Sequence, residues 1–584
     1  MTSKIQYKIA FLFLFVGLQA IWSQKKDENI GTEVVNVVKS YTPTISDAFK
    51  VKEAPSLEDE DNTKREVITY NTFPFPVAST FSPSKGKAAG VERTERENLF
   101  NNYLTLGLGN YGAVNSELFV TENISREEYF GLMLRHISSQ GGLKEVELEN
   151  KFYTTSLDLT YGKQHNNSTW NANMGYKNQI YNWYGLPADF GTALLPVDRT
   201  VLINGIDPLH QFHNFYISGK INVDQSAFNE ADFKYNRFWD ARGSAGNRFY
   251  AKPSFSFDVA NEKIKINFIA DYLGGSFKKD YTSPAEIQYG FTNFGVHPSI
   301  VINENDWSVN FGAALFYSVD TANKANKFYV YPKLKASFKV VGDLMILYAG
   351  AEGSLSQNSY ADFANDNPYV SPTLNIKPTD QKYDVFAGLR GKFANNISYN
   401  VRGAYRSEKD KALFKSQNFT ANATNEDYSF GNSFGVVYDN MKTINIYGEL
   451  KADFSKNLSF GINGTFNSYK NDIEAEAWNL PALKLGASLD INITEKWSTG
   501  TNLFFVGDRK DLQLNNDIVT LVPIAPVTLK SYFDANLHLQ YAHNERLSGF
   551  LKFNNIANQA YQKWLNYPVQ GFQFVLGACY KFDF

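Results

Sequence analysis

Apolar and polar residues alternate with a period of two in segment after segment of this chain, from about residue 98 to the C-terminus. In "KIKINFIADY", Ile264, Ile266 and Phe268 share one face, and Lys263 and Lys265 share the other. The same alternation runs through "KFYVYPKLKASFKV", "TINIYGELKADF" and "YFDANLHLQY". Such alternation predicts β-strands with one apolar and one polar face. Many of these segments are longer than the five or six residues usual in soluble sheets.

Composition narrows the fold class. The 584-residue chain is 15% aromatic, with 47 Phe and 35 Tyr, yet its mean hydropathy is −0.35. Its one apolar run, near the N-terminus, is shorter than the roughly 18 residues that a membrane helix needs. Alternating strands combine many aromatics with low hydropathy, because each apolar residue has polar neighbours. Since the polar faces are charged and no fixed-period repeat marks a soluble propeller, we predict an all-β, transmembrane antiparallel β-barrel.

The joints between the predicted strands alternate between short and long. The short joints begin at Ala260, Asn303, Gly342, Ala394, Ser455, Thr494 and His543, and the long ones span Gly185–His210, Gln357–Gln381 and Asp508–Thr528. Outer-membrane barrels have short periplasmic turns and longer outer loops. We count about 22–24 strands, and the higher number includes a strand at Lys411–Phe419. The last strand must pair with the first, at about Asn101–Gly109, to leave no open edge.

The N-terminus predicts export. "MTSKIQYKIAFLFLFVGLQAIWSQ" has Lys4 and Lys8 before an apolar stretch and Ser23 at a cleavage position, as in a secretory signal peptide. The following stretch is rich in Pro, Ser, Lys and Glu, which favours an extended state. We therefore predict a signal peptide at 1–23, an extended periplasmic tail at 24–97 and the barrel at 98–584. The predicted location is the outer membrane of a Gram-negative bacterium.

The final two strands carry a more specific pattern. Its residues are Phe553, Asn554, Asn555, Ile556, Asn558, Tyr561, Tyr567, Pro568, Gly571, Phe574, Gly577, Tyr580 and Phe582. This pattern resembles the C-terminus of TonB-dependent receptors, although Gly571-Phe572 stands where that family has Gly-Arg. The resemblance implies a large barrel for nutrient uptake. Only about 70 residues separate the signal peptide from the first strand, so the family's plug domain is expected to be absent or reduced to a tail.

Two sets of contact residues are predicted. One set, in "GTEVVNVVKSYTP", is similar to the TonB box, the segment that pairs as a strand with TonB: Glu33, Val34, Val35, Asn36, Val37 and Val38. The alternative is a β-prone tail segment that docks inside the barrel or pairs with another chain. The second set is an aromatic signal for the barrel-assembly machinery at the end of the chain: Tyr580, Phe582 and Phe584.

The polar strand faces supply the remaining candidates, which we predict to face the lumen. They are Lys333, Lys335, Arg390, Arg402, Arg406, Glu449, Lys451, Asp453, Asp534 and His538. No catalytic, cofactor-binding or metal-binding residues are predicted, and the chain is predicted not to be an enzyme. His210 and His213 in "HQFH" are interpreted as residues of an outer loop. The single cysteine, Cys579, excludes an intrachain disulfide.

Three functions remain open. The first is TonB-dependent-receptor-like uptake of a nutrient too large for small porins. The second is a plug-less barrel that serves as a structural subunit of an outer-membrane complex, and the third is a passive channel. Expected partners are outer-membrane lipids, the barrel-assembly machinery, and TonB or a periplasmic or outer-membrane protein that binds the tail. The net charge of −3 and the lack of a basic stripe argue against nucleic acid.

Overall fold

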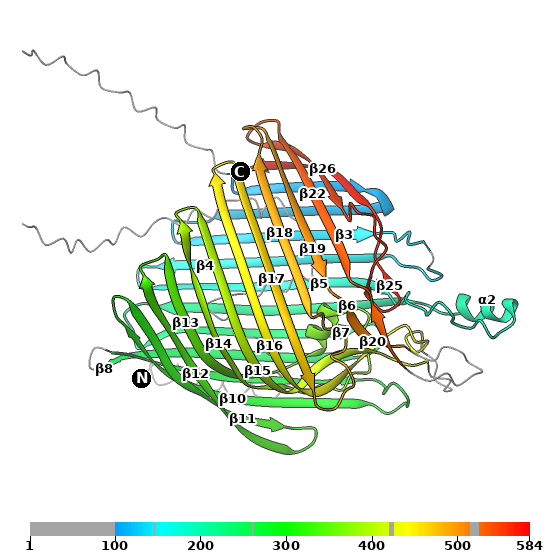
Figure 1. The fold of residues 1–584 in the computed structure, drawn as a ribbon, viewed down its shortest axis with the longest axis horizontal. Helices are drawn as coiled ribbons and strands as arrows, with labels where there is room; N and C mark the ends of the chain where they lie inside the picture. The colour runs from blue at the N-terminus through cyan, green and yellow to red at the C-terminus, as the bar shows by residue number, and fades with distance from the viewer. Residues whose placement is uncertain (1–99, 145, 260–261, 420–425, 514–524) are drawn as a thin grey trace, which may run out of the picture. The chain divides into compact units, whose positions relative to one another are not determined.

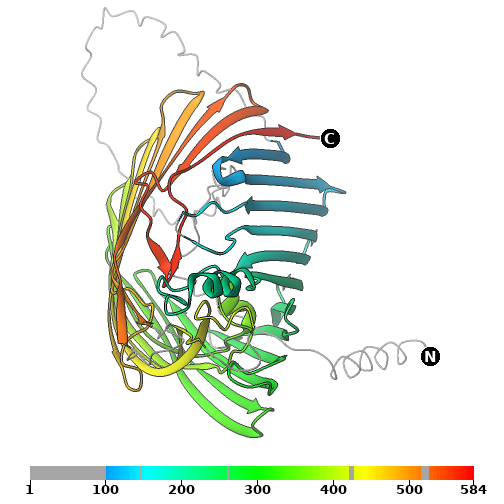
Figure 2. The same ribbon diagram turned by 90° about the vertical axis from the view of Figure 1, so that its right-hand side faces the viewer.

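A computed structural model describes residues 100–584 apart from residues 145, 260–261, 420–425 and 514–524. The predicted signal peptide, the predicted tail and the segment 33–38 lie outside the described residues. Within the described part, a single sheet of 22 antiparallel strands closes on itself as a transmembrane barrel (Figures 1 and 2). Among the described helices, none has the length and apolar character needed to cross a membrane.

The barrel strands follow chain order around the ring. They are β1 (Asn102–Gly109), β2 (Ala113–Asn123), β3 (Glu128–Ser139), β4 (Phe152–His165), β5 (Ser168–Asn182), β6 (Leu209–Val223), β7 (Phe228–Asp240), β8 (Ala245–Val259), β9 (Glu262–Phe277), β10 (Ile287–Asn303), β11 (Trp307–Asp320), β12 (Ala325–Val341), β13 (Met345–Ser356), β14 (Thr379–Ala394), β15 (Ile397–Ser416), β16 (Phe434–Ser455), β17 (Leu458–Asn471), β18 (Leu483–Asn492), β19 (Trp497–Val506), β22 (Tyr532–Ala542), β23 (Leu547–Asn554) and β26 (Gln573–Phe582). The smaller elements are η3 (Asn110–Gly112), α2 (Pro196–Asn204), α3 (Tyr360–Asp366), β20 (Arg509–Gln513), β21 (Ala525–Leu529), β24 (Gln562–Trp564) and β25 (Tyr567–Pro568).

The first and last strands close the barrel. β1 pairs antiparallel with β26, with Asn102 opposite Phe582 and Gly107 opposite Gly577. The predicted pairing of the chain's last strand with its first is therefore confirmed, and so is a strand number within the predicted range. Closure satisfies the backbone groups of both edges, which a sheet in lipid requires.

The alternation of the sequence becomes two different barrel faces. On β1, Leu104, Leu106 and Leu108 are all exposed, and the last is 66% exposed. Tyr103, the neighbour of Leu104, is buried and donates a hydrogen bond from its hydroxyl to the Glu117 carboxylate. Because consecutive strand residues point to opposite faces, the leucines face lipid and the polar residues face the lumen.

The two rims of the barrel differ in their connections. One rim carries the chain ends of the sheet and the short turns, and the opposite rim carries the long connections, α2, α3 and both small hairpins (Figure 1). The predicted short joints all fall on the first rim, and the predicted long joints all fall on the second. We call the second the loop-bearing rim, and in an outer-membrane barrel it faces the outside.

One strand prediction is wrong. Lys411–Phe419 is not a separate strand, because residues 411–416 continue β15 and pair with the start of β16. The pairing register shifts between Glu408 and Lys411, and Asp410 has a φ of +52°. This irregularity has the form of a β-bulge, which bends a strand without ending it. It lets β15 and β16 continue as a two-stranded extension toward the loop-bearing rim.

Candidate functional site: the closure of the loop-bearing rim

The connections of the loop-bearing rim pack together around one hydrophobic cluster, which we call the loop core. Its buried residues are Leu148, Tyr184, Phe190, Ile203, Ile206, Phe212, Phe238, Leu273, Phe277, Tyr289, Phe291, Tyr360, Phe363, Ala364, Val370, Leu374, Ile376, Phe430, Phe434, Trp564 and Tyr567. They come from five connections and from the ends of β6, β7, β9, β10 and β16. Figure 2, which faces this rim, shows these connections between the walls of the barrel.

Aromatic rings join connections that start far apart around the ring. The Tyr567 ring, between β23 and β26, stacks on Tyr369 between β13 and β14, with 3.7 Å between ring centroids. Tyr567 also contacts Tyr184, between β5 and β6, at 4.8 Å. The strands that carry these connections are not neighbours in the sheet. The three connections therefore meet by reaching across the mouth of the barrel.

The connection that contains α3 is fastened to the barrel wall by polar contacts. Tyr360 donates a hydrogen bond from its hydroxyl to Asp240 at 2.7 Å, and that carboxylate also accepts from the backbone N–H groups of Arg242 and Ser244, each at 2.9 Å. On β8, Arg248 forms a 2.9 Å ion pair with Asp362. Buried hydrogen bonds of this kind are costly to break when one partner stays buried. The α3 connection is thus held to β7 and β8.

The connection between β15 and β16 links to the same region. The Asn432 side chain donates to the backbone oxygens of Trp183 and Asp427, each at 2.9 Å, and its own backbone oxygen accepts from Tyr567. Arg242 forms a 2.8 Å ion pair with Asp427 and lies over the Trp183 ring. Backbone carbonyls that would be left unpaired by loop opening are therefore satisfied in the closed arrangement.

The polar contacts around Asp240 and Asn432 form one polar clamp, and a second polar clamp lies at the β20–β21 hairpin. The buried Asp511 carboxylate accepts from the Ser416 backbone at 3.1 Å, from the Ser416 hydroxyl at 3.0 Å and from the Asn479 amide at 2.9 Å. Burial raises the pKa of Asp511, and these hydrogen bonds oppose that shift. Arg509 donates to the backbone oxygens of Gln562 and Lys563. Three connections of the rim and the end of β15 are joined in this way.

Comparison with known proteins decides the type of barrel. No family model and no curated protein matches this chain. Solved structures do match. The ferripyoverdine receptor of the outer membrane of Pseudomonas aeruginosa, bound to ferripyoverdine, is 12% identical over 84% of this chain and 73% of its own, with a TM-score of 0.59. The barrel has the fold of TonB-dependent receptors.

Two further receptors support this assignment of fold. The siderophore receptor PirA from Acinetobacter baumannii is 10% identical, covers 84% of this chain and 81% of its own, and has a TM-score of 0.61. The ferric-catecholate import receptor Fiu from K12 E. coli, in its closed form, is 10% identical over 83% of this chain and 82% of its own, with a TM-score of 0.59. This chain therefore shares the fold of these outer-membrane receptors, which we call the receptor-type barrel, although its sequence identity to them is very low.

Some of the predicted lumen-facing residues come together in the receptor-type barrel. Arg402 and Arg406 both contact one oxygen of Asp384, at 2.8 and 3.4 Å. Lys335 lies 3.1 Å from Glu352, and Lys451 lies 2.5 Å from Glu449. Asp384 and Glu352 were missed in the sequence, because the register that brings them opposite the arginines and lysines was not known.

The other predicted lumen-facing residues lie apart from these pairs. Arg390 lies over the Tyr348 ring, and Asp534 accepts a 2.7 Å hydrogen bond from Tyr561. Lys333 is paired in register with Glu352, His538 lies on β22, and Asp453 lies at the turn-bearing end of β16. The set therefore spreads over several strands and does not converge on one centre.

The interpretation of His210 and His213 as loop residues is wrong, because both lie in β6. Their separation of three places them on opposite faces of the strand, so they cannot hold the same ion. His210 is buried between the Trp183 and Phe212 rings, with its Nε2 atom 3.9 Å from Asp240. Within the described ranges, no three His, Cys, Asp or Glu side chains gather closely enough for a metal ion.

The closure of the receptor-type barrel should depend on pH through Lys563 in β24. Burial, with Arg509 and Lys484 nearby, lowers the pKa of this lysine to about 8 from 10.5. A cation whose folded-state pKa is lowered destabilises the folded form below that value, and the penalty disappears as pH rises from about 8 to 10.5. We expect slower proteolysis of residues 555–572 at pH 9 than at pH 7, after normalisation to an unstructured substrate. Lys563→Met should remove most of this difference; an identical pH slope in both proteins would contradict the assignment.

Proposed function

We propose that this protein is an outer-membrane uptake receptor of the TonB-dependent type in a Gram-negative bacterium. Its outer connections would capture a solute, and the solute would cross the lumen once the connections separate. The observation that carries this proposal is the loop core, which joins connections from distant parts of the ring across the mouth. The likeness of the barrel to import receptors supports the same class of function.

Opening the mouth would be costly, which favours an energised mechanism over a passive channel. The loop core buries large aromatic side chains such as Tyr360 and Tyr567, each 1% exposed. Exposing one such side chain costs roughly 2–3 kcal/mol, and the polar clamps add to this. Thermal motion would therefore open the mouth rarely. We propose that the tail segment 33–38 transmits force from TonB, and that the aromatic end of β26 directs assembly of the barrel.

The proposal is tested by uptake in cells. Replacing Val35 and Val37 with proline removes backbone donors that strand pairing with TonB would use. We expect growth on the transported nutrient to fall to the level of a deletion strain, while the amount of folded barrel in the outer membrane is unchanged. The matched control, Val35→Ile with Val37→Ile, keeps strand propensity and should grow normally. Normal growth of the proline variant would exclude energised uptake through this segment.

A structural subunit remains the second candidate because of α2. Leu195, Val197 and Val201 on or next to this helix are 71%, 73% and 68% exposed. Arg199 holds the helix through two hydrogen bonds to Glu147, at 3.0 and 2.5 Å. A rigid apolar surface on the water-exposed side of a barrel fits a protein contact. Purification in mild detergent without a stoichiometric companion would count against this candidate.

A further inference from the structure

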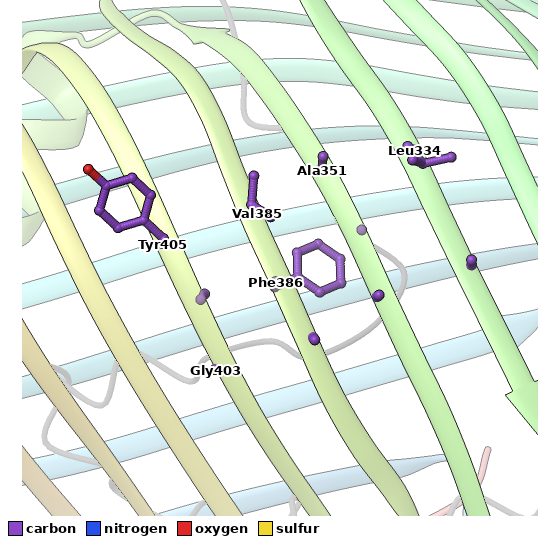
Figure 3. Close-up of a pocket in the computed structure, with 11 residues that line it drawn as sticks. Leu334, Ala351, Val385, Phe386, Gly403 and Tyr405 are labelled. Atoms are coloured by element: carbon purple, nitrogen blue, oxygen red, sulfur yellow. The ribbon is translucent and has the colours of Figure 1, made fainter. Parts of the chain in front are cut away.

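The lumen wall built by β12, β13, β14 and β15 places charged residues in cross-strand rows. In one row, Lys333 pairs with Glu352, Glu352 with Asp384, and Asp384 with Arg406. Directly paired residues in an antiparallel sheet point to the same face. This face is the lumen face, since Val385 and Phe386 project from opposite sides of β14 (Figure 3) and Val385 is 47% exposed on the outer side.

The rows closer to the rim with the short turns carry cations as well. No carboxylate of β12, β13, β14 or β15 is directly paired with these cations. Next to Lys335 stand Gly350, Phe386 and Ala404, and next to Arg402 stand Gly388 and Tyr348. We call seven cationic residues of this wall, from the row of Lys333 to the rim with the short turns, the cationic strip. It consists of Lys333, Lys335, Lys339, Arg390, Lys392, Arg402 and Arg406.

The carboxylates within reach of the strip are too few to neutralise it. Glu352 is 3.1 Å from Lys335, Asp343 is 3.9 Å from Lys339, and a single oxygen of Asp384 serves both Arg402 and Arg406, so three carboxylates serve seven cations. The other carboxylate oxygen of Asp384 and the buried Nε atom of Arg406 have no hydrogen-bond partner among the described protein atoms. A buried guanidinium N–H that lacks an acceptor is costly. The strip therefore carries more positive charge than its neighbouring carboxylates balance.

Aromatic rings hold two of the arginines in place. The Arg402 guanidinium lies 4.4 Å from the centroid of Phe386, and that of Arg390 lies 5.6 Å from the centroid of Tyr348. Cation–π contacts fix a guanidinium plane while leaving its edge N–H groups free to bind acceptors. A guanidinium edge binds carboxylate and phosphate groups with two parallel hydrogen bonds.

The lumen wall built by β6, β7, β8 and β9, two strands away in the ring, has a different balance of charge. On β6, Lys220 lies 3.6 Å from Glu230 and 3.8 Å from Asp232, and Lys265 on β9 lies 3.1 Å from the same Glu230. In this group, two cations lie within ion-pair distance of two carboxylates. A uniformly lined lumen would not separate charge in this way, whereas one cationic wall gives an anionic solute a preferred side.

We propose that the cationic strip is a binding site for solutes that carry two or more carboxylate or phosphate groups. The inference rests on the proposed function, since it names the class of solute that the lumen would take up. Binding at several spaced cations favours multivalent anions over monovalent ones, because each additional ion pair adds to the affinity. The interaction should weaken as salt is raised, since the strip lines a water-accessible wall.

The test is citrate binding to the full-length protein in detergent, measured by calorimetry at low salt. In the strip variant, Lys339→Gln, Arg390→Gln and Lys392→Gln remove three positive charges from the cationic strip. In the control variant, Lys220→Gln, Lys234→Gln and Lys265→Gln remove three charges from the wall built by β6, β7, β8 and β9. We expect the strip variant to lose affinity about ten-fold or more and the control variant to lose less than about two-fold.

The outcomes separate this inference from the proposed function. Equal affinities in the two triple variants, or no citrate binding by the unmodified protein, would overturn the anion site. Binding of spermine with similar affinity would overturn its preference for anions. Failure of energised uptake would instead appear as normal growth after replacement of Val35 and Val37 by proline, with citrate affinity unchanged.

Discussion

Replacing Tyr360 with alanine is expected to open the loop-bearing mouth of the barrel. The Tyr360 ring lies against Phe212, Phe238 and Phe277, with centroids 5.9, 5.0 and 4.9 Å away, and its hydroxyl donates to Asp240. Loss of a buried aromatic side chain costs about 3–5 kcal/mol. This cost falls on the α3 connection, while the strands of the barrel stay paired. In planar bilayers, we expect the variant to show frequent open-channel events where the unmodified protein shows few.

The matched control for this prediction is Tyr360→Phe. It keeps the ring and removes only the hydroxyl, so Asp240 loses one of its donors at a cost of about 1–3 kcal/mol. An intermediate open probability is expected. If the alanine variant conducts no more than the unmodified protein, and its α3 connection resists protease equally well, Tyr360 does not hold the mouth closed.

The second large effect is expected at the seam between β1 and β26. Gly577 faces Gly107, and a Cβ atom at position 577 would overlap the Leu106 backbone oxygen and the Phe550 ring. The backbone oxygen belongs to the sheet and cannot move aside as a side chain could. Gly577→Val should therefore destabilise closure by about 3 kcal/mol or more. We expect the heat-modifiable, folded form to be largely lost from the outer membrane on unheated gels.

Ala578→Val is the control on the neighbouring residue. Ala578 is exposed on the lipid-facing side of β26, opposite Leu106. An added β-branched side chain there meets lipid and should leave the folded form unchanged. Equal amounts of folded protein in the two variants would mean that the contacts of Gly577 do not limit barrel closure.

The loop core at the loop-bearing mouth suggests how such a barrel would work. Connections from distant strands are joined by rings and hydrogen bonds at one mouth, so a solute that replaces these contacts would lower the cost of separating them. Asp240 is central because it links β7, the turn after it and α3. Loss of this carboxylate would therefore loosen several of these elements at once.

The sequence by itself determined the barrel. Side-chain alternation is a local property, so residues such as Ile264 and Lys263 reveal their faces without knowledge of any partner strand. Pairing of the last strand with the first also follows, because an open edge in lipid is too costly. Long connections were recognisable from their turn residues and length. The extra strand at Lys411–Phe419 was predicted wrongly, because a bulge at Asp410 leaves little trace in the alternation.

Only the tertiary structure decided what closes the loop-bearing mouth and how charge is arranged inside. Tyr184 donates a hydrogen bond to the Pro568 backbone oxygen across 384 residues of sequence. Residues in the connections follow no period, so nothing local indicates that they share a core. Likewise, Arg402 and Arg406 meet Asp384 only because the strand register aligns them. Contacts of this kind arise from the ring geometry of the sheet, which brings distant segments together, and the amino-acid pattern of each segment alone does not encode it.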